Sequence, residues 1–482
     1  MKEIRQAGWA QASRERLLAA GALLRLRPFD VSTVEGQSKE RYRRAALTAL
    51  TALASKGTTL LTLLVSVPLT VNYLGAERFG LWMAISALFA FLNLLDFGVG
   101  NGLLNRVVEA NGRGDPGNLR AAVSSGFFLL CGLATALLTV FALVYPLMPW
   151  PALFNIGSPE AMAEAGPAVA AFVVTFALGL PLSVVSRVQL GFQEGLFSNL
   201  WQIAGNLAGF GGLLVVVGCR GGLVWLVAAV TGLPVLVQVL NGAHYFLRVR
   251  PGLMPQWTVC AATECRRLAQ TGGALFLLQV FALAWNYLDV FVITHAVSLE
   301  AAGQYAVLLR MFAVTMVAQF FITALWPAYG DALARHDTTW ARRTLSRALL
   351  GSLALCLAAG TPLVLWGDWI ATDLLRAGFR PDKTQLVGFL VLSALMLVCG
   401  NLSMLLVHGE VLRRQVWFYG LAAGEALVLK LTVVGTHGIA GVVWASNLAF
   451  GLIYTPCAWA LAREAVARRG APGSATPRPT SL

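Results

Sequence analysis

The chain has 482 residues, of which 57% are apolar and only 12% are charged, and its mean hydropathy is +0.69. Soluble domains carry roughly 25% charged residues, so this composition excludes a water-soluble protein, and also a disordered, collagen-like or disulfide-stapled chain. The net charge of +13 lies mainly in short segments between apolar runs, which indicates membrane orientation rather than nucleic-acid binding. We therefore expect an all-α polytopic membrane protein, because each span in lipid must satisfy its own backbone hydrogen bonds.

The N-terminal segment 1–44 differs from the rest of the chain, because it holds ten basic and five acidic residues. Residues 9–26 fit a short basic amphipathic helix on the membrane surface, and a disordered tail is the other interpretation. No apolar stretch followed by a small-residue cleavage site precedes the first span, so the segment is not a signal peptide. We predict a basic cytoplasmic extension.

Twelve apolar runs are long enough to cross a membrane, at ~20 residues for each crossing. Their approximate bounds are 45–74, 79–103, 121–148, 167–191, 196–218, 222–246, 269–297, 302–328, 345–367, 384–408, 416–434 and 438–462. The loops between them are short, so the function is expected to reside within the helical bundle.

The distribution of Lys and Arg predicts the orientation. With the N-terminus in the cytoplasm, the cytoplasmic segments hold 27 basic residues and the opposite segments hold five. Cytoplasmic loops of membrane proteins carry such an excess. Both termini are therefore expected in the cytoplasm, and the composition of residues 463–482 predicts a disordered tail.

The two halves of the chain resemble each other. The stretch Gly75–Trp82 recurs as Ser298–Tyr305, with Glu, Gly and an aromatic residue at the same spacing. The charges of one cytoplasmic loop recur 222 positions later, as Arg113, Asp115 and Arg120 against Arg335, Asp337 and Arg342. Because each half begins on the same side, we predict two six-helix lobes in a parallel repeat, with a central cavity between them. The predicted parts are an N-lobe at 45–246, a cytoplasmic linker at 247–268 and a C-lobe at 269–462.

The stretch 68–108 contains a YLG-x-E-x-x-G-x-W turn followed by L-L-D-x-G-x-G. Together with Asp289 in NYLDVFVI and with QLGFQEGL at 189–196, it resembles Wzx-like oligosaccharide flippases. These form the polysaccharide-transporter branch of the superfamily that also holds MATE exporters and lipid II flippases. The resemblance covers about 45–465.

This resemblance implies a function and a location. Family members move a polyprenyl-diphosphate-linked oligosaccharide from the cytoplasmic to the periplasmic leaflet of the bacterial inner membrane, for cell-surface polysaccharide biosynthesis. A polysaccharide polymerase and other assembly proteins are the implied partners. MATE exporters share the twelve-helix plan, so a MATE-like ion-coupled exporter of small molecules is the alternative.

Ionisable residues inside the predicted spans are the candidate site residues, because such groups are costly in lipid and usually face a partner or a cavity. Lys56 and Asp96 lie equally far from the turn near residue 76, and Asp289 and Arg310 equally far from the next such turn. Two ion pairs are therefore predicted, Lys56–Asp96 and Asp289–Arg310. Each is interpreted either as a structural bridge or as a cavity pair whose base attracts the diphosphate.

Three further embedded charges complete this set. Arg187 either guides the phosphate group or extends to the interface. Lys430 is assigned to the same cationic cavity, and Asp96 and Asp289 to ion coupling. Glu425 is interpreted either as a further ion-coupling group or as an acid buried beside a polar neighbour. Amide and aromatic side chains suited to sugar contacts, or to hydrogen bonds between helices, are Gln279, Trp285 and Asn286.

Catalytic motifs are not evident. The sequence has no Walker motif, no H-E-x-x-H and no G-x-S-x-G. Its seven cysteines match no common zinc spacing. We expect a transporter rather than an enzyme, with no cofactor and no metal. A polysaccharide polymerase or ligase, the third hypothesis, would need a long outside loop, which the sequence lacks.

Overall fold

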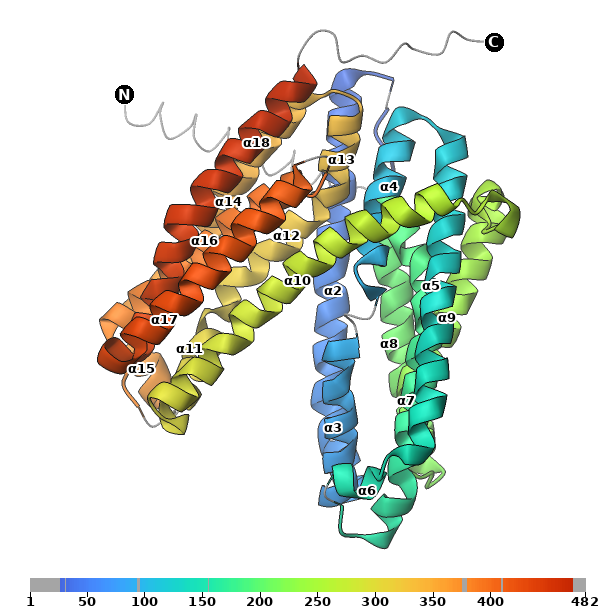
Figure 1. Cartoon of the computed structure of the whole chain (residues 1–482), viewed down its shortest axis with the longest axis vertical. Helices are drawn as coiled ribbons and strands as arrows, with labels where there is room; N and C mark the ends of the chain where they lie inside the picture. The colour runs from blue at the N-terminus through green and yellow to red at the C-terminus, as the bar shows by residue number, and fades with distance from the viewer. Residues whose placement is uncertain are drawn as a thin grey trace, which may run out of the picture. The chain divides into compact units, whose positions relative to one another are not determined.

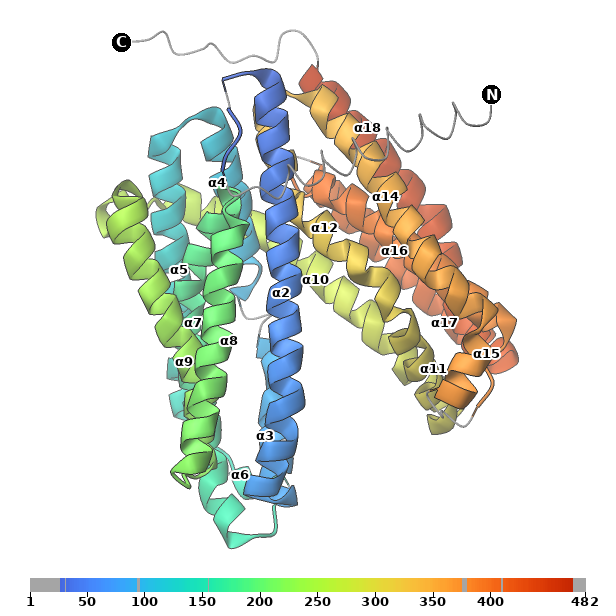
Figure 2. The same ribbon diagram turned by 180° about the vertical axis from the view of Figure 1, so that it is seen from behind.

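The computed structural model describes residues 27–30, 32–92, 96–154, 156–374, 379–408 and 411–470. Nearly all of these residues are helical, so the all-α prediction is confirmed (Figure 1, Figure 2). The predicted surface helix at 9–26 and the tail from 471 onward lie outside the described residues. The main helices are α2 (Val34–Leu74), α3 (Ala76–Leu92), α4 (Val99–Arg113), α5 (Pro116–Val144), α7 (Pro159–Gly191), α8 (Gly195–Gly218), α9 (Leu223–His244), α10 (Ala262–Ala296), α11 (Leu299–Phe312), α12 (Ala318–Ala324), α13 (Trp326–Ala334), α14 (Thr338–Leu365), α16 (Lys383–Leu406), α17 (Leu412–Ala449) and α18 (Thr455–Gly470).

Ten helical stretches within the described part are long and apolar enough to cross a membrane. The predicted second span, 79–103, is not among them because the chain divides it into α3 and α4. Between these helices, Phe97 and Gly98 have positive φ values of 47° and 72°, so the backbone leaves the helical conformation there. This span was predicted as one helix, and the structure corrects it to two.

The last stretch, Leu412–Ala467, was predicted as two spans, 416–434 and 438–462. Gly438 has non-helical angles (φ 52°, ψ −135°), which a glycine adopts without steric cost. A continuous helix would separate Tyr419 from Tyr454 by about 50 Å, yet their ring centroids lie 5.0 Å apart. The chain therefore reverses at Gly438, and the prediction of two spans is confirmed.

The chain forms two compact units, one extending to Gln270 and the other beginning at Thr271. In the first unit, α5, α7, α8 and α9 lie side by side (Figure 1, Figure 2). Buried aliphatic residues of α4, such as Leu103 and Val107, pack with Val184 and Val188 of α7. Gly191 permits this close approach, because a Cβ there would lie 2.5 Å from Val107 Cγ1.

The turn between α2 and α3 is tied to the start of α7. Glu77 Oε1 accepts hydrogen bonds from the N–H groups of Gly157, at 2.5 Å, and Ser158, at 3.1 Å. Arg78 forms an ion pair with Glu164 at 2.7 Å. These contacts hold the predicted outside end of the first unit together.

In the second unit, α14, α16, α17 and α18 pack against one another. Its corner before α14 repeats the corner before α5 at the offset of 222 positions. Gly114 (φ 68°) and His336 (φ 60°) occupy the same left-handed position in the two corners. The next residue, Asp115 or Asp337, caps the following helix through its side chain. The repeat predicted from these loops is therefore present as local structure.

Candidate functional site

The break between α3 and α4 places a carboxylate at the start of a helix inside the first unit. Asp96 Oδ1 accepts a hydrogen bond from the Gly98 N–H at 2.8 Å. Gly98 stands directly before α4, whose first N–H groups attract negative charge. Discontinuous helices of this kind commonly form the binding sites of membrane transporters.

Arg187 of α7 extends to this break. Its Nη1 donates a hydrogen bond to Asn101 Oδ1 at 2.7 Å. A Cβ added at Gly100 would lie 3.0 Å from Arg187 Nε and 3.1 Å from Asp96 Oδ2, so both charged groups approach this glycine. The first unit therefore gathers an acid, a base and an amide at one interrupted helix.

The predicted Lys56–Asp96 ion pair is wrong. Lys56 has an exposed side chain on α2 and forms no ion pair with Asp96 within the described residues. The neighbouring face of α2 contacts α8, where Ser55 donates a hydrogen bond to Gln202 at 2.8 Å. Equal distance from a turn fixed the depth of the two charges but not the side of the helix on which each lies.

The second helix of the second unit is also interrupted. After α11 ends at Phe312, the residues Ala313–Val317 form a 3-10 helix before α12 begins at Ala318. At the repeat offset of 222, this interruption falls opposite the break between α3 and α4. Unlike the break before α4, this stretch has right-handed helical angles at both ends, so the chain changes its winding here without leaving the helical conformation.

Arg310 lies in the last turn of α11, directly before this interruption. Its side chain is exposed and has no acidic partner among the residues that the structure describes. Arg310 therefore presents a positive charge within the span Glu300–Ala334.

Asp289 pairs with Lys430 of α17, so the predicted Asp289–Arg310 ion pair is wrong. The Asp289 and Lys430 side chains are each only 2% exposed, and Lys430 Nζ donates to Asp289 Oδ1. Tyr305 of α11 donates a second hydrogen bond to Asp289 Oδ2 at 2.6 Å. Burial of both charges requires such a partner for each, because an uncompensated ion in this environment costs several kcal/mol.

The remaining predicted residues occupy different environments. Glu425 lies half-buried on α17, and its Oε2 is buried without a hydrogen-bond partner in the described part of the chain. Gln279 is half-buried on α10. The side chains of Trp285 and Asn286 lie outside the description, so the predicted sugar contacts at these positions stay predictions.

Two partners in these sites were not predicted as such, Tyr305 and Asn101. Tyr305 lies about half as far from the turn near 299–300 as Asp289 does, so the depth argument applied to charges would not have paired this phenol with Asp289. No sequence signal links Asn101 to Arg187 either, because the two residues belong to helices far apart in sequence.

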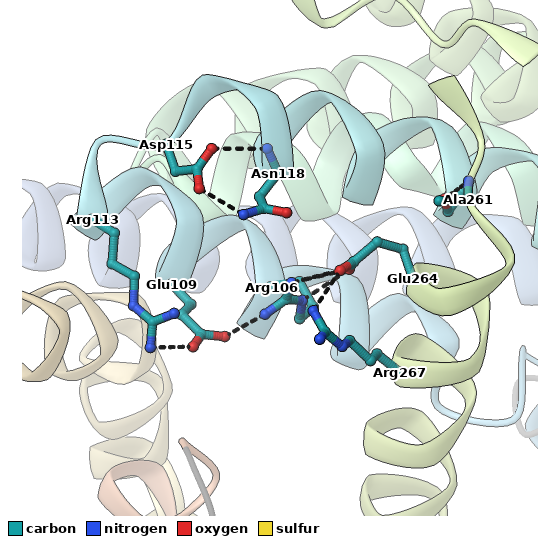
Figure 3. A network of polar contacts seen from close by, with 9 residues as sticks. Arg106, Glu109, Arg113, Asp115, Asn118, Ala261, Glu264 and Arg267 are labelled. Atoms are coloured by element: carbon teal, nitrogen blue, oxygen red, sulfur yellow. Dashed lines mark hydrogen bonds and ion pairs between the residues drawn. The ribbon is translucent and has the colours of Figure 1, made fainter. Parts of the chain in front are cut away.

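A network of charges at the predicted cytoplasmic end fixes α4, which carries Asn101, to the first turn of α10. Figure 3 shows Arg106 between Glu109, at 2.7 Å, and Glu264, at 2.9 Å. Arg267 also contacts Glu264, at 3.0 Å. Glu264 is 4% exposed, and its Oε1 contacts both arginines. This network holds the helix that follows the break.

Comparison with known proteins establishes the fold. No family model matches the chain, and no curated protein matches it. An outward-facing multidrug resistance MATE family transporter of the MOP superfamily is similar in structure, with a TM-score of 0.71 and 13% identity over 89% of this chain and 97% of that one. A MOP superfamily transporter from Pyrococcus furiosus, described as having a binding pocket of reverse polarity, has a TM-score of 0.69 and 13% identity, with 89% and 95% covered. The chain thus has the polytopic all-α fold of these transporters.

Proposed function

We propose that this protein is a membrane transporter, not an enzyme, and that it moves a polyprenyl-diphosphate-linked oligosaccharide across the bacterial inner membrane. Arg310 carries the proposal, as an exposed cation inside a span with no acidic partner among the described residues. Such a charge is costly against lipid. A doubly charged diphosphate passing along the bundle would supply the partner that the described residues do not provide.

The distribution of embedded charge supports an anionic substrate. Asp289 is already neutralised by Lys430, and Asp96 lies close to Arg187. Lys56 and Arg310 remain exposed. A guanidinium presents a planar pair of donors that matches phosphate oxygens, so Arg310 is the main contact and Lys56 supplies a further positive charge nearer the cytoplasm.

The test is lipid analysis of a deletion strain. Loss of a flippase makes glycan-diphosphate lipids accumulate in the cytoplasmic leaflet, where a membrane-impermeant glycan-modifying enzyme cannot reach them on intact spheroplasts. Mass spectrometry of the extracted lipids is expected to show accumulation without modification. Accumulated lipids that are fully modified from outside would contradict the proposal.

Variants connect that phenotype to the site. The variants Arg310→Ala and Lys56→Ala are expected to insert normally into the membrane. Strains that carry them are expected to lose surface polysaccharide, because each substitution removes a cation proposed to bind the diphosphate. Lys383→Ala, which removes an exposed cation at the start of α16, is the matched control. Full restoration of polysaccharide by both embedded variants would exclude the cationic mechanism.

A MATE-like ion-coupled exporter of small molecules is the second candidate, and the fold favours it equally. The neighbouring structures include a multidrug resistance MATE family transporter. Glu425, with a buried carboxylate oxygen that lacks a partner in the described residues, would serve ion coupling in either candidate. An unchanged lipid pool together with faster killing by cationic dyes and drugs in the deletion strain would favour the exporter.

A further inference from the structure

A basic cavity of about 570 Å³ opens at the start of α14 in the second unit, at the predicted cytoplasmic end. Three arginines and three hydroxyl side chains line it, namely Arg342, Arg343, Arg347, Thr338, Thr339 and Ser346. Val466 of α18 contributes an apolar wall.

The charge of this cavity is uncompensated. No acidic residue belongs to its described lining, and none of its three arginines forms an ion pair with another described residue. All three side chains are exposed, so they are accessible to a ligand. Guanidinium groups with neighbouring hydroxyls are suited to phosphate oxygens.

An apolar stripe continues from these arginines along α14. Helical spacing places Leu350 and Leu357 on the face that carries Arg343 and Arg347. Leu350 is 71% exposed and Leu357 is 51% exposed, and both lie in a helix hydrophobic enough to cross the membrane. A matching ligand therefore has an anionic head at the interface and a hydrocarbon chain that extends into the bilayer.

The corresponding surface in the first unit is covered by the chain itself. At the offset of 222, Arg343 and Arg347 correspond to Ala121 and Ser125. Ser125 Oγ accepts a hydrogen bond from the Ala261 N–H at 3.2 Å, and the adjacent Ser124 accepts one from the Gln256 N–H at 3.1 Å. The second unit thus differs from the first in carrying two additional arginines where the first carries a covering segment.

The C-terminal residues 471–482 do not match this charge. They contain one arginine and no acidic side chain, so they would add positive charge to a cavity that already holds three arginines.

We propose that this cavity binds the phosphate of an anionic glycerophospholipid of the cytoplasmic leaflet, with an acyl chain along Leu350 and Leu357. Basic pockets on this side of membrane helices recognise such headgroups. The proposal does not rest on the transported substrate.

The test measures lipid binding to the full-length protein in detergent by native mass spectrometry, with phosphatidylglycerol and phosphatidylcholine as probes. The variant Arg342→Gln/Arg343→Gln/Arg347→Gln is compared with Arg248→Gln/Arg266→Gln/Arg413→Gln, which removes the same charge from exposed positions outside the cavity. We expect the cavity variant to bind phosphatidylglycerol about tenfold more weakly or worse, and the control variant to match the wild type. Arg347→Gln alone, with a smaller loss, replaces the triple variant if that one does not fold.

Four results would overturn the proposal. The first is equal phosphatidylglycerol binding by the wild type and the cavity variant, and the second is equal binding of phosphatidylcholine and phosphatidylglycerol. The third is complete competition by inorganic phosphate at equal concentration, which would assign the cavity to a free anion. A chain ending at Gly470 is expected to bind like the wild type, whereas the fourth result, binding that appears only after this truncation, would assign the cavity to the C-terminal segment.

Discussion

The break before α4 in the first unit and the 3-10 stretch after α11 in the second occupy corresponding positions in the repeat. The embedded charges of the two units have different partners. In the first unit, Arg187 is half-buried and hydrogen-bonded to the neutral amide of Asn101. In the second, Lys430 and Asp289 form a direct ion pair that is almost fully buried. The first unit therefore bonds its embedded cation, Arg187, to a neutral group beside the break. The second unit pairs Lys430 with Asp289 and leaves Arg310 exposed beside the 3-10 stretch. The duplicated framework does not dictate which charges are available.

The largest expected effect is on the free energy of unfolding when the buried Asp289–Lys430 ion pair is broken. Lys430→Met leaves Asp289 buried without its cation, which costs about 3–5 kcal/mol in other proteins. Unfolding of the purified protein in mild detergent, titrated with denaturant, is expected to show a loss of this size.

A second substitution separates the loss of the ion-pair interaction from the cost of leaving the Asp289 carboxylate buried without a partner. Asp289→Asn in the Lys430→Met background removes that charge and is expected to recover part of the stability. Lys383→Met, at an exposed lysine, is the control and should unfold like the wild type. A Lys430→Met variant as stable as that control would mean that the buried pair is unimportant for the fold.

Removing the hydrogen-bond partner of Arg187 in the first unit should lower the stability less than removing Lys430 does. Asn101→Ala removes the amide that accepts from Arg187, and a hydrogen bond to a charged group contributes about 1.5–3 kcal/mol. Because Arg187 is only half-buried and Asp96 lies nearby, we expect a loss at the lower end of this range in the same denaturant titration. A loss as large as that of Lys430→Met would remove the contrast between the two units.

Substitution of Tyr305 tests how much its hydrogen bond to Asp289 adds to the stability of the Asp289–Lys430 pair. Tyr305→Phe removes one hydrogen bond to Asp289 and leaves the ion pair with Lys430. Because Asp289 keeps its ion pair with Lys430, we expect a loss of about 1.5 kcal/mol, the lower end of the range for a hydrogen bond to a charged group, in the denaturant titration. Tyr145→Phe, at a half-buried tyrosine of the first unit whose hydroxyl has no hydrogen bond to another described residue, controls for the loss of a hydroxyl group. Equal stability of the two variants would show that the Asp289–Lys430 pair does not need the phenol.

The smallest expected effect concerns pH at the outside end of the first unit. Hydrogen bonds from Ser158 and from the Gly157 N–H lower the pKa of Glu77 from its ordinary value near 4.5. A lowered pKa stabilises the fold above the unfolded value, and this contribution disappears as the pH falls through the folded value. Glu77→Gln is therefore expected to unfold slightly more easily than the wild type at neutral pH, with the difference shrinking as the pH falls below the ordinary pKa value of the carboxyl group. A difference that persists at low pH would contradict this assignment.

Several features were predictable because they depend on local sequence. The reversal at Gly438 was placed correctly between two apolar runs, since a glycine lies where the second run begins. The repeated corners were recognised from Asp115 and Asp337, and both residues cap the helices that follow them. Helix caps act over three or four residues, so their signal is contained in the nearby sequence.

The ion pairs were predicted poorly because they depend on rotation about the helix axis. Distance from a turn gives the depth of Asp289 and Arg310 but not the neighbour that each faces. Asp289 pairs with Lys430, which lies 141 positions later in the chain on a different helix. The break before α4 was also missed, because apolar residues continue through it and hydropathy does not register a change of backbone angles.

The sequence by itself determined that this chain is an all-α membrane protein with a duplicated framework, because apolar length and repeated loops are properties of short segments. Only the tertiary structure decided which embedded charges neutralise one another and which remain exposed. That choice depends on how helices distant in sequence pack side by side, since a buried charge is stable only where packing brings it a partner.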